Sequence, residues 1–207
     1  MFAALLLAVS ALAAPSGPTL LDRCREAAPE LRAEPLEAAL AAWRHLSGDG
    51  LAARPRLAVI DYGLPSTVPR LWVFDLEQGR LLYRELVAHG RGSGEDLATV
   101  FSDVPGSFTS SLGAFVTGET YTGRNGYSLR LRGVEPERNR RAEERAIVVH
   151  GAAYVGEATA RALGRLGRSH GCPAVRPEIA RRVIDDLKDR AVLYAWHPSL
   201  RASGPGA

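Results

Sequence analysis

Apolar positions near the start of the chain recur at the spacing of an α-helix. In the 36–46 segment they fall three or four positions apart, at Leu36, Leu40, Trp43 and Leu46. We therefore expect residues 18–47 to be helical, with Pro29 and Pro35 dividing them into two short helices. The Ser-Gly-Asp-Gly run at residues 47–50 is typical of a helix end.

Further along, short aliphatic and aromatic runs predict a β-rich body. These runs cover residues 56–62, 69–76, 81–89, 127–133, 146–150 and 191–196. Residues 77–80 have the composition of a hairpin loop between two of them. Residues 90–126 are rich in Gly, Ser and Thr, so we expect long loops with short strands there.

Two more helices are predicted among the later strands, at residues 156–166 and 177–189. Pro177 stands where proline is favoured, in a helix's first turn. The predicted class is α+β, dominated by β-structure, with flanking helices. We divide the chain into a helical segment (14–50), a β-rich domain (51–198) and a disordered tail (199–207).

Composition and charge indicate which classes of protein the sequence fits. Hydrophobic residues make up 46% of the 207 residues, enough for a sizeable core. The net charge is only +3 and the arginines are dispersed, so no basic arm suggests a nucleic-acid partner. We expect a monomer.

An apolar run from Phe2 to Leu12 is followed by a small-x-small pattern ending at Ala13. This pattern is typical of a secretory signal peptide, here residues 1–13, although the basic start of such peptides is missing. The alternatives are a core helix or a wrongly assigned start. The run is too short to span a bilayer, which takes about 20 apolar residues. We therefore expect export to the periplasm or cell envelope without stable membrane insertion.

The sequence GRSHGCPAV (167–175) carries the strongest chemical signal. A cysteine becomes an effective nucleophile when a base or backbone N–H groups stabilise its thiolate. His170 is adjacent, but His150 ends a predicted strand and can be held rigidly, so we prefer His150 as the base of Cys172. N–H groups near Gly171 and Cys172 are candidate oxyanion donors, because Pro173 has none.

Two other roles for Cys172 remain open. One is a disulfide with Cys24, since an exported chain with two cysteines can form such a bond. The other is a zinc site with His150 and His170, completed by His89 or His197. The chain has no CxxC or HExxH motif, so we expect neither a metal nor another cofactor.

HGAAYV (150–155) followed by GRSHGCPAV resembles the YkuD-like murein L,D-transpeptidases, in the branch with HGAxYV and GRSxGCPAV. Other stretches are similar too, and the resemblance covers roughly residues 36–197. It implies a β-sandwich-like catalytic domain and a cysteine acyl-enzyme. The implied donor is a peptidoglycan tetrapeptide stem, which releases D-alanine and forms a 3→3 cross-link. Sensitivity to carbapenems and a cell-envelope location are also implied.

The resemblance assigns roles to particular residues. Cys172 matches the nucleophile and His150 the base, while Ser169 and Gly171 match supporting positions of the catalytic motif. The commoner motif has an arginine two positions after the cysteine, where this chain has Ala174. For substrate binding we select five other residues, with Arg168 and then Arg176 as carboxylate partners: Arg168, Gly151, His170, Tyr127 and Arg176. Tyr121 is an alternative to Tyr127 as an oxyanion donor.

Three functions remain open. The same thiolate supports transfer to an amine, or hydrolysis as an L,D-carboxypeptidase or as an endopeptidase that removes lipoproteins from the wall. A non-catalytic wall-binding module is the third possibility.

Overall fold

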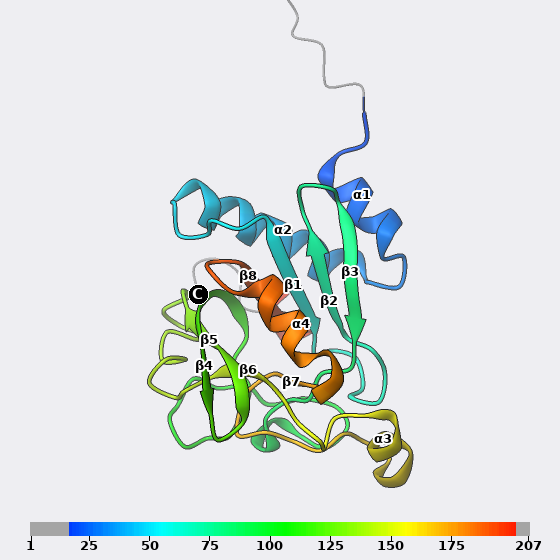
Figure 1. Cartoon of the computed structure of the whole chain (residues 1–207), viewed down its shortest axis with the longest axis vertical. Coiled ribbons are helices and arrows are strands. Elements are labelled where there is room, and N and C mark those ends of the chain that lie inside the picture. The colour runs from blue at the N-terminus through cyan, green and yellow to red at the C-terminus, as the bar shows by residue number, and fades with distance from the viewer. Residues whose placement is uncertain (1–16, 202–207) are drawn as a thin grey trace, which may run out of the picture.

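The computed structural model describes residues 17–201. Figure 1 shows a β-sheet with helices on both sides. The helices are α1 (Leu20–Ala27), α2 (Ala33–Gly48), α3 (Glu157–Leu163) and α4 (Pro177–Leu187), with short 3₁₀ helices at Arg91–Ser93 and Pro198–Arg201. The strands are β1 (Arg56–Asp61), β2 (Leu71–Asp75), β3 (Arg80–Glu85), β4 (Gly113–Gly123), β5 (Gly126–Gly133), β6 (Val148–Gly151), β7 (Ala174–Val175) and β8 (Val192–Trp196). The expected signal peptide, residues 1–13, lies outside the described residues.

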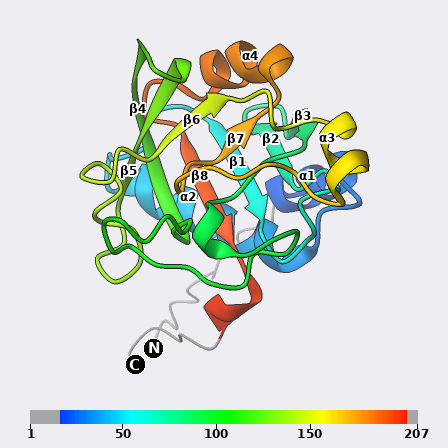
Figure 2. The same cartoon turned by 90° about the horizontal axis from the view of Figure 1, so that it is seen from below.

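The eight strands form one sheet in the order β3-β2-β1-β8-β4-β5-β6-β7. Two neighbouring pairs, β1–β8 and β6–β7, are parallel, and the other pairs are antiparallel. The chain that leaves edge strand β3 returns to the opposite edge, where Ala88 donates its N–H to the Ala174 carbonyl at 2.8 Å. Figure 2 views this end of the molecule, with β6, β7 and the segment between β3 and β4. The predicted α+β, β-dominated class is confirmed.

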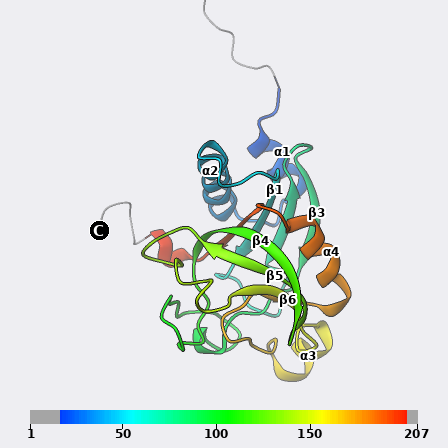
Figure 3. The ribbon, with the colours of Figure 1, turned by 60° about the vertical axis from the view of Figure 1, so that its left-hand side comes forward.

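Both faces of the central strands are buried. Along β1, Leu57 and Val59 belong to a cluster beneath α1 and α2, while Ala58 and Ile60 belong to the cluster beneath α4. Figure 3 shows α2 and α4 on opposite sides of the sheet. Alternate side chains of a strand point to opposite faces, so a strand covered on both faces reads as a continuous apolar run.

Most predicted elements form close to where the sequence places them. Pro29 separates α1 from α2 as expected. Pro35, in contrast, does not break α2 but lies in its first turn, where backbone N–H groups have no partner within the helix. α2 therefore runs unbroken for 16 residues.

The largest difference is β4. It is an 11-residue strand inside the segment expected to hold long loops and short strands. Its Gly and Thr content hid it, but it is stabilised by pairing with β5 on one side and β8 on the other. The two-residue strand β7, also unpredicted, is formed by the last two residues of the GRSHGCPAV motif. The expected disordered tail begins with an ordered turn, since Pro198–Arg201 is a 3₁₀ helix, and residues 202–207 lie outside the described range.

α1 and α2 are part of the same folded unit as the sheet. Leu36 and Leu40 are fully or almost fully buried in one cluster with Trp72 and Phe74. A boundary at residue 51 would thus divide a hydrophobic core. Between residues 17 and 201, no helix combines the length and the apolar character that crossing a membrane requires.

A chain that begins at residue 51 should therefore fail to fold. Without α2, the apolar sheet face around Trp72 and Phe74 would be exposed to water, and a patch of this kind promotes aggregation. Solubility and near-UV circular dichroism would measure the effect, with a chain beginning at residue 17 as the control. A soluble, cooperatively folding chain from residue 51 would contradict this expectation.

Candidate active site

Cys172 and His150 line one cleft of about 440 Å³. Three parts of the chain form it: the tip of the β4–β5 hairpin, the end of β6 with the residues that follow, and the turn before β7. The lining residues are Arg124, Asn125, His150, Gly151, Ala152, Ala153, Tyr154, Arg168, Ser169, His170 and Cys172.

β6 positions His150 between two partner strands. His150 lies opposite Ser128 of β5 and Ala174 of β7, and its side chain is nearly buried. Its Nδ1 lies 3.0 Å from the Gly151 carbonyl oxygen. A carbonyl can only accept a hydrogen bond, so in the neutral ring Nδ1 carries the proton and Nε2 keeps its lone pair. This is the tautomer that a general base requires, with Nε2 as the basic atom.

The Cys172 thiol is 9% exposed and lies 3.7 Å from the Ala146 carbonyl oxygen. Burial raises the pKa of Cys172, against smaller lowering effects from the Val148 N–H and the Arg145 charge. Burial also lowers the pKa of His150. Both shifts disfavour charge and so favour a neutral thiol beside a neutral imidazole. No hydrogen bond joins Cys172 to His150 in the described structure.

Ser169 shapes the turn around the cysteine. Its Oγ accepts the Gly171 N–H at 3.0 Å and donates to the Cys172 carbonyl at 2.6 Å. Gly171 has φ of +125°, and a Cβ there would lie 2.7 Å from the Thr109 carbonyl oxygen. Within residues 171–173, Ser169 occupies the Gly171 N–H and Pro173 has none, so the Cys172 N–H is the candidate oxyanion donor.

The expected substrate-binding residues divide into two groups. Gly151, Arg168 and His170 line the cleft, and the His170 ring packs against Phe108 with centroids 4.7 Å apart. The Arg168 guanidinium donates to the Gly94 carbonyl and pairs with Glu95 at 2.7 Å.

The other two lie outside the cleft lining. Glu85 holds the Arg176 guanidinium with two hydrogen bonds, of 2.9 and 2.7 Å. The Tyr127 hydroxyl donates to Asp185 at 2.7 Å beneath α4. These side chains stabilise the packing of α4, and Tyr121, the alternative to Tyr127, packs against the Arg130 guanidinium.

Several site residues were missed from the sequence. Arg124 and Asn125 form the tip of the β4–β5 hairpin and face the cleft. The Asn125-Gly126 pair is a strong hairpin signal that could have located this tip. Tyr154 also lines the cleft, and burial raises its pKa to about 12, so its hydroxyl stays protonated.

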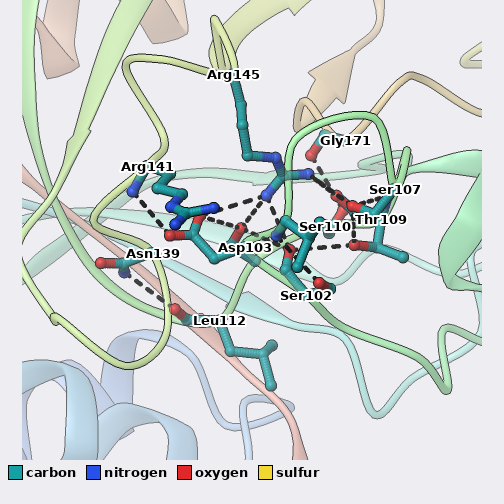
Figure 4. Close-up of polar contacts among 12 residues, drawn as sticks. Ser102, Asp103, Ser107, Thr109, Ser110, Leu112, Asn139, Arg141, Arg145 and Gly171 are labelled. Carbon is teal, nitrogen blue, oxygen red and sulfur yellow. Dashed lines mark hydrogen bonds and ion pairs between the residues drawn. The ribbon is translucent and has the colours of Figure 1, made fainter.

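A buried cation supports the site from behind. The Arg145 side chain is 3% exposed and donates to the Ser102 and Thr109 carbonyls at 2.8 and 2.6 Å. Its guanidinium also contacts Asp103, and Figure 4 shows it gathering the 102–111 loop beside Gly171. Every one of these contacts joins the loop to the segment just before β6.

The geometry supports neither the disulfide between Cys24 and Cys172 nor a zinc site that includes Cys172. Cys24 and Cys172 are both free, and they belong to different core clusters. Within residues 17–201, no three His, Cys, Asp or Glu side chains are grouped in a way that could hold a metal ion. His89, one proposed zinc ligand, instead lies with Nδ1 2.7 Å from the Arg70 guanidinium.

The L,D-transpeptidase catalytic domain family matches the chain over residues 27–196. None of the curated proteins gives a significant match. Among solved structures, an L,D-transpeptidase from Mycobacterium smegmatis is 15% identical, with a TM-score of 0.43 over 69% of this chain and 58% of that one. L,D-transpeptidase 3 from Mycobacterium tuberculosis is 13% identical, with a TM-score of 0.41 over 69% and 61%. This chain spans less than two thirds of either structure.

The resting protonation state is testable by alkylation. Because burial raises the thiol's pKa, the rate at which iodoacetamide modifies Cys172 should keep rising with pH beyond the ordinary thiol range. Peptide mass mapping would separate Cys172 from Cys24, and denatured protein would give the unperturbed profile. A rate that levels off at or below neutral pH would instead demonstrate a preformed thiolate–imidazolium pair.

Proposed function

Because the chain belongs to the L,D-transpeptidase catalytic domain family, we propose that it is an exported cysteine L,D-transpeptidase that acts on peptidoglycan tetrapeptide stems. The observation that supports this most is the shared cleft of Cys172 and His150, with Nε2 of His150 unprotonated. The apolar run and cleavage pattern within residues 1–13 support export.

The first half-reaction is acylation of Cys172. His150 Nε2 takes the thiol proton, and Sγ attacks the carbonyl between the L-centre of the third stem residue and D-alanine. The Cys172 N–H donates to the oxyanion that forms. When the intermediate collapses, the C–N bond breaks, His150 gives its proton to the departing amine, and the acyl group remains on sulfur.

The second half-reaction transfers this acyl group. The side-chain amine of another third residue attacks the thioester and loses a proton to His150, and the C–S bond breaks to regenerate the thiol. The product is a 3→3 cross-link. If water attacks instead, the same residues act as an L,D-carboxypeptidase or as a wall-lipoprotein endopeptidase. The intact Cys172–His150 constellation argues against a non-catalytic wall-binding module.

A neutral resting pair is suited to this sequence of steps. The buried thiol and imidazole stay uncharged until substrate is bound, so the thiolate forms beside the carbonyl that it attacks. No step requires a metal.

Cys172→Ala should abolish product formation from purified muropeptides, together with any covalent adduct with a carbapenem, because both need the thiol. EDTA should leave both intact. Product analysis and intact-protein mass spectrometry would measure these outcomes, with Cys24→Ala as the matched control. A Cys172→Ala protein with full activity would refute the proposal.

The same assay separates the two enzymatic alternatives. Transfer yields dimers in which the third residues of two stems are cross-linked, whereas hydrolysis yields trimmed monomers. Dimers formed by the wild-type chain, but not by Cys172→Ala, would establish transfer. Trimmed monomers alone would assign the chain to the hydrolytic alternative.

We also propose Arg124 as the substrate's carboxylate partner. The tetrapeptide ends in a D-alanine carboxylate, and an arginine fork binds such a group through two parallel hydrogen bonds. Arg124 lines the cleft and makes no ion pair with any residue of the described range, whereas Arg168 is paired with Glu95. We therefore place Arg124 ahead of both Arg168 and Arg176 as the carboxylate partner, since Glu85 holds the Arg176 guanidinium.

Arg124→Ala should raise KM for the tetrapeptide donor about tenfold, since hydrogen bonds to charged groups contribute roughly 1.5–3 kcal/mol. A donor whose terminal carboxylate is amidated should bind the variant and the wild type equally. Arg161→Ala, on the exposed face of α3, is the control and should change the affinity for neither the tetrapeptide donor nor the amidated donor. An equal loss of affinity for both donors would show that Arg124 does not bind the carboxylate.

A further inference from the structure

Ser110 is a buried serine directly behind the nucleophile turn. It is 1% exposed and lies in the loop that leads to β4. Its hydroxyl oxygen lies 3.0 Å from the Gly90 nitrogen and 3.1 Å from the Gly171 carbonyl oxygen. The Gly90 N–H can only donate and the Gly171 carbonyl can only accept. The Ser110 hydroxyl must therefore accept from Gly90 and donate to Gly171.

This hydrogen bond also fixes the next N–H along the chain. The Gly171 carbonyl and the Cys172 N–H belong to one planar trans peptide, in which the two groups point in opposite directions. Holding the carbonyl toward Ser110 therefore turns the Cys172 N–H away from it, to the other side of the turn. Within residues 171–173 that N–H is the donor left for an oxyanion, because the Gly171 N–H is bound to Ser169 and Pro173 has none.

Contacts with neighbouring segments on three sides restrict the movement of Ser110. A Cβ on Gly90 would lie 2.8 Å from the Gly171 Cα, so the two backbones touch directly. The Ser110 N–H is held by Ser93 Oγ at 2.8 Å. On its other side, Arg145 binds the Thr109 carbonyl, as Figure 4 shows. Ser110 is thus held from three directions, and the hydrogen bond from its hydroxyl in turn holds the Gly171–Cys172 peptide in place.

We propose that Ser110 is a positioning residue for the oxyanion hole: its hydroxyl holds the Gly171 carbonyl so that the Cys172 N–H faces the oxyanion of the tetrahedral intermediate. This inference rests on the proposed acylation of Cys172. It does not make Ser110 a catalytic residue, because its hydroxyl bonds the Gly90 and Gly171 backbones and also faces the buried Tyr62 side chain, and none of these is a reacting group. The proposal requires that loss of the Ser110 hydroxyl lower the rate at which the thiol attacks a carbonyl, but not the rate of thiol reactions that form no oxyanion.

The test compares two reactions of the same thiol. Acylation of Cys172 by p-nitrophenyl acetate passes through a tetrahedral oxyanion: a C–S bond forms, the C–O bond to nitrophenolate breaks, and the thiol proton is lost. Alkylation by iodoacetamide displaces iodide at a tetrahedral carbon and forms no oxyanion. Both rates would be measured at Cys172 by peptide mass mapping in the full chain, at several pH values.

Ser110→Ala should lower the ratio of acylation rate to alkylation rate about tenfold, less than the roughly 10²–10³-fold loss that follows removal of an oxyanion donor. Ser110→Thr keeps the hydroxyl and should retain the wild-type ratio. Ser111→Ala is the matched control, since Ser111 is also buried but bonds Ser102 and Arg145 rather than Gly171. It should leave the ratio unchanged, even if both rates fall together.

A Ser110→Ala ratio equal to that of the wild type would overturn the proposal, as would an equal fall in the ratio for Ser111→Ala. If Ser110→Ala does not fold, Ser110→Cys serves instead, because its thiol is a weaker donor of similar shape and should also lower the ratio. The experiment also distinguishes failure of the proposed function from failure of the Ser110 proposal. A wild-type chain that reacts with the ester at Cys172 but leaves muropeptides unchanged would refute the proposed function while the ratio still tests Ser110.

Discussion

The structure depends on one close backbone contact, between the segment after β3 and the turn that carries Cys172. Three backbone hydrogen bonds join them: Ala88 N–H to Ala174, Ser169 N–H to His89, and Arg91 N–H to Ser169. Gly90 lies so close to Gly171 that a Cβ on Gly90 would be 2.8 Å from the Gly171 Cα. This contact brings the two edges of the eight-stranded sheet together and places Cys172 beside β6, where His150 is fixed.

Buried polar side chains stabilise this contact, and each has its hydrogen bonds within the loops that it joins. Arg70 is fully buried and binds the Leu64 and Val87 carbonyls and His89. Arg145 binds the 102–111 loop in the same way on the other side of the turn. An unpaired buried charge would cost several kcal/mol, so these arginines fix the loops only because their donors are satisfied. The result is a rigid turn in a cleft whose thiol and imidazole are both neutral.

The sequence predicted much of this site, and the reasons are physical. His150 could be assigned because it ends a short apolar strand, and Cys172 because glycine and proline flank it in a turn. The pairing of Arg176 with Glu85 of β3 could not be predicted from sequence, because the two residues are 91 positions apart. The contact of Ser110 with Gly171 spans 61 positions and was missed for the same reason. The place of Arg124 in the cleft was missed although the neighbouring Asn125-Gly126 pair is a hairpin signal.

The sequence by itself determined the class of fold and the order of nearly all helices and strands, and it predicted Cys172 as the nucleophile and His150 as its base. These follow from local periodicity, turn residues and a motif, all of which act over a few neighbouring positions. Only the tertiary structure decided the tautomer of His150, the burial that shifts the pKa values of Cys172 and His150, the length of β4 and the hydrogen bonds around the Gly171–Cys172 peptide. These depend on burial and on hydrogen bonds between segments far apart in the chain, and such contacts leave no periodic trace in the sequence.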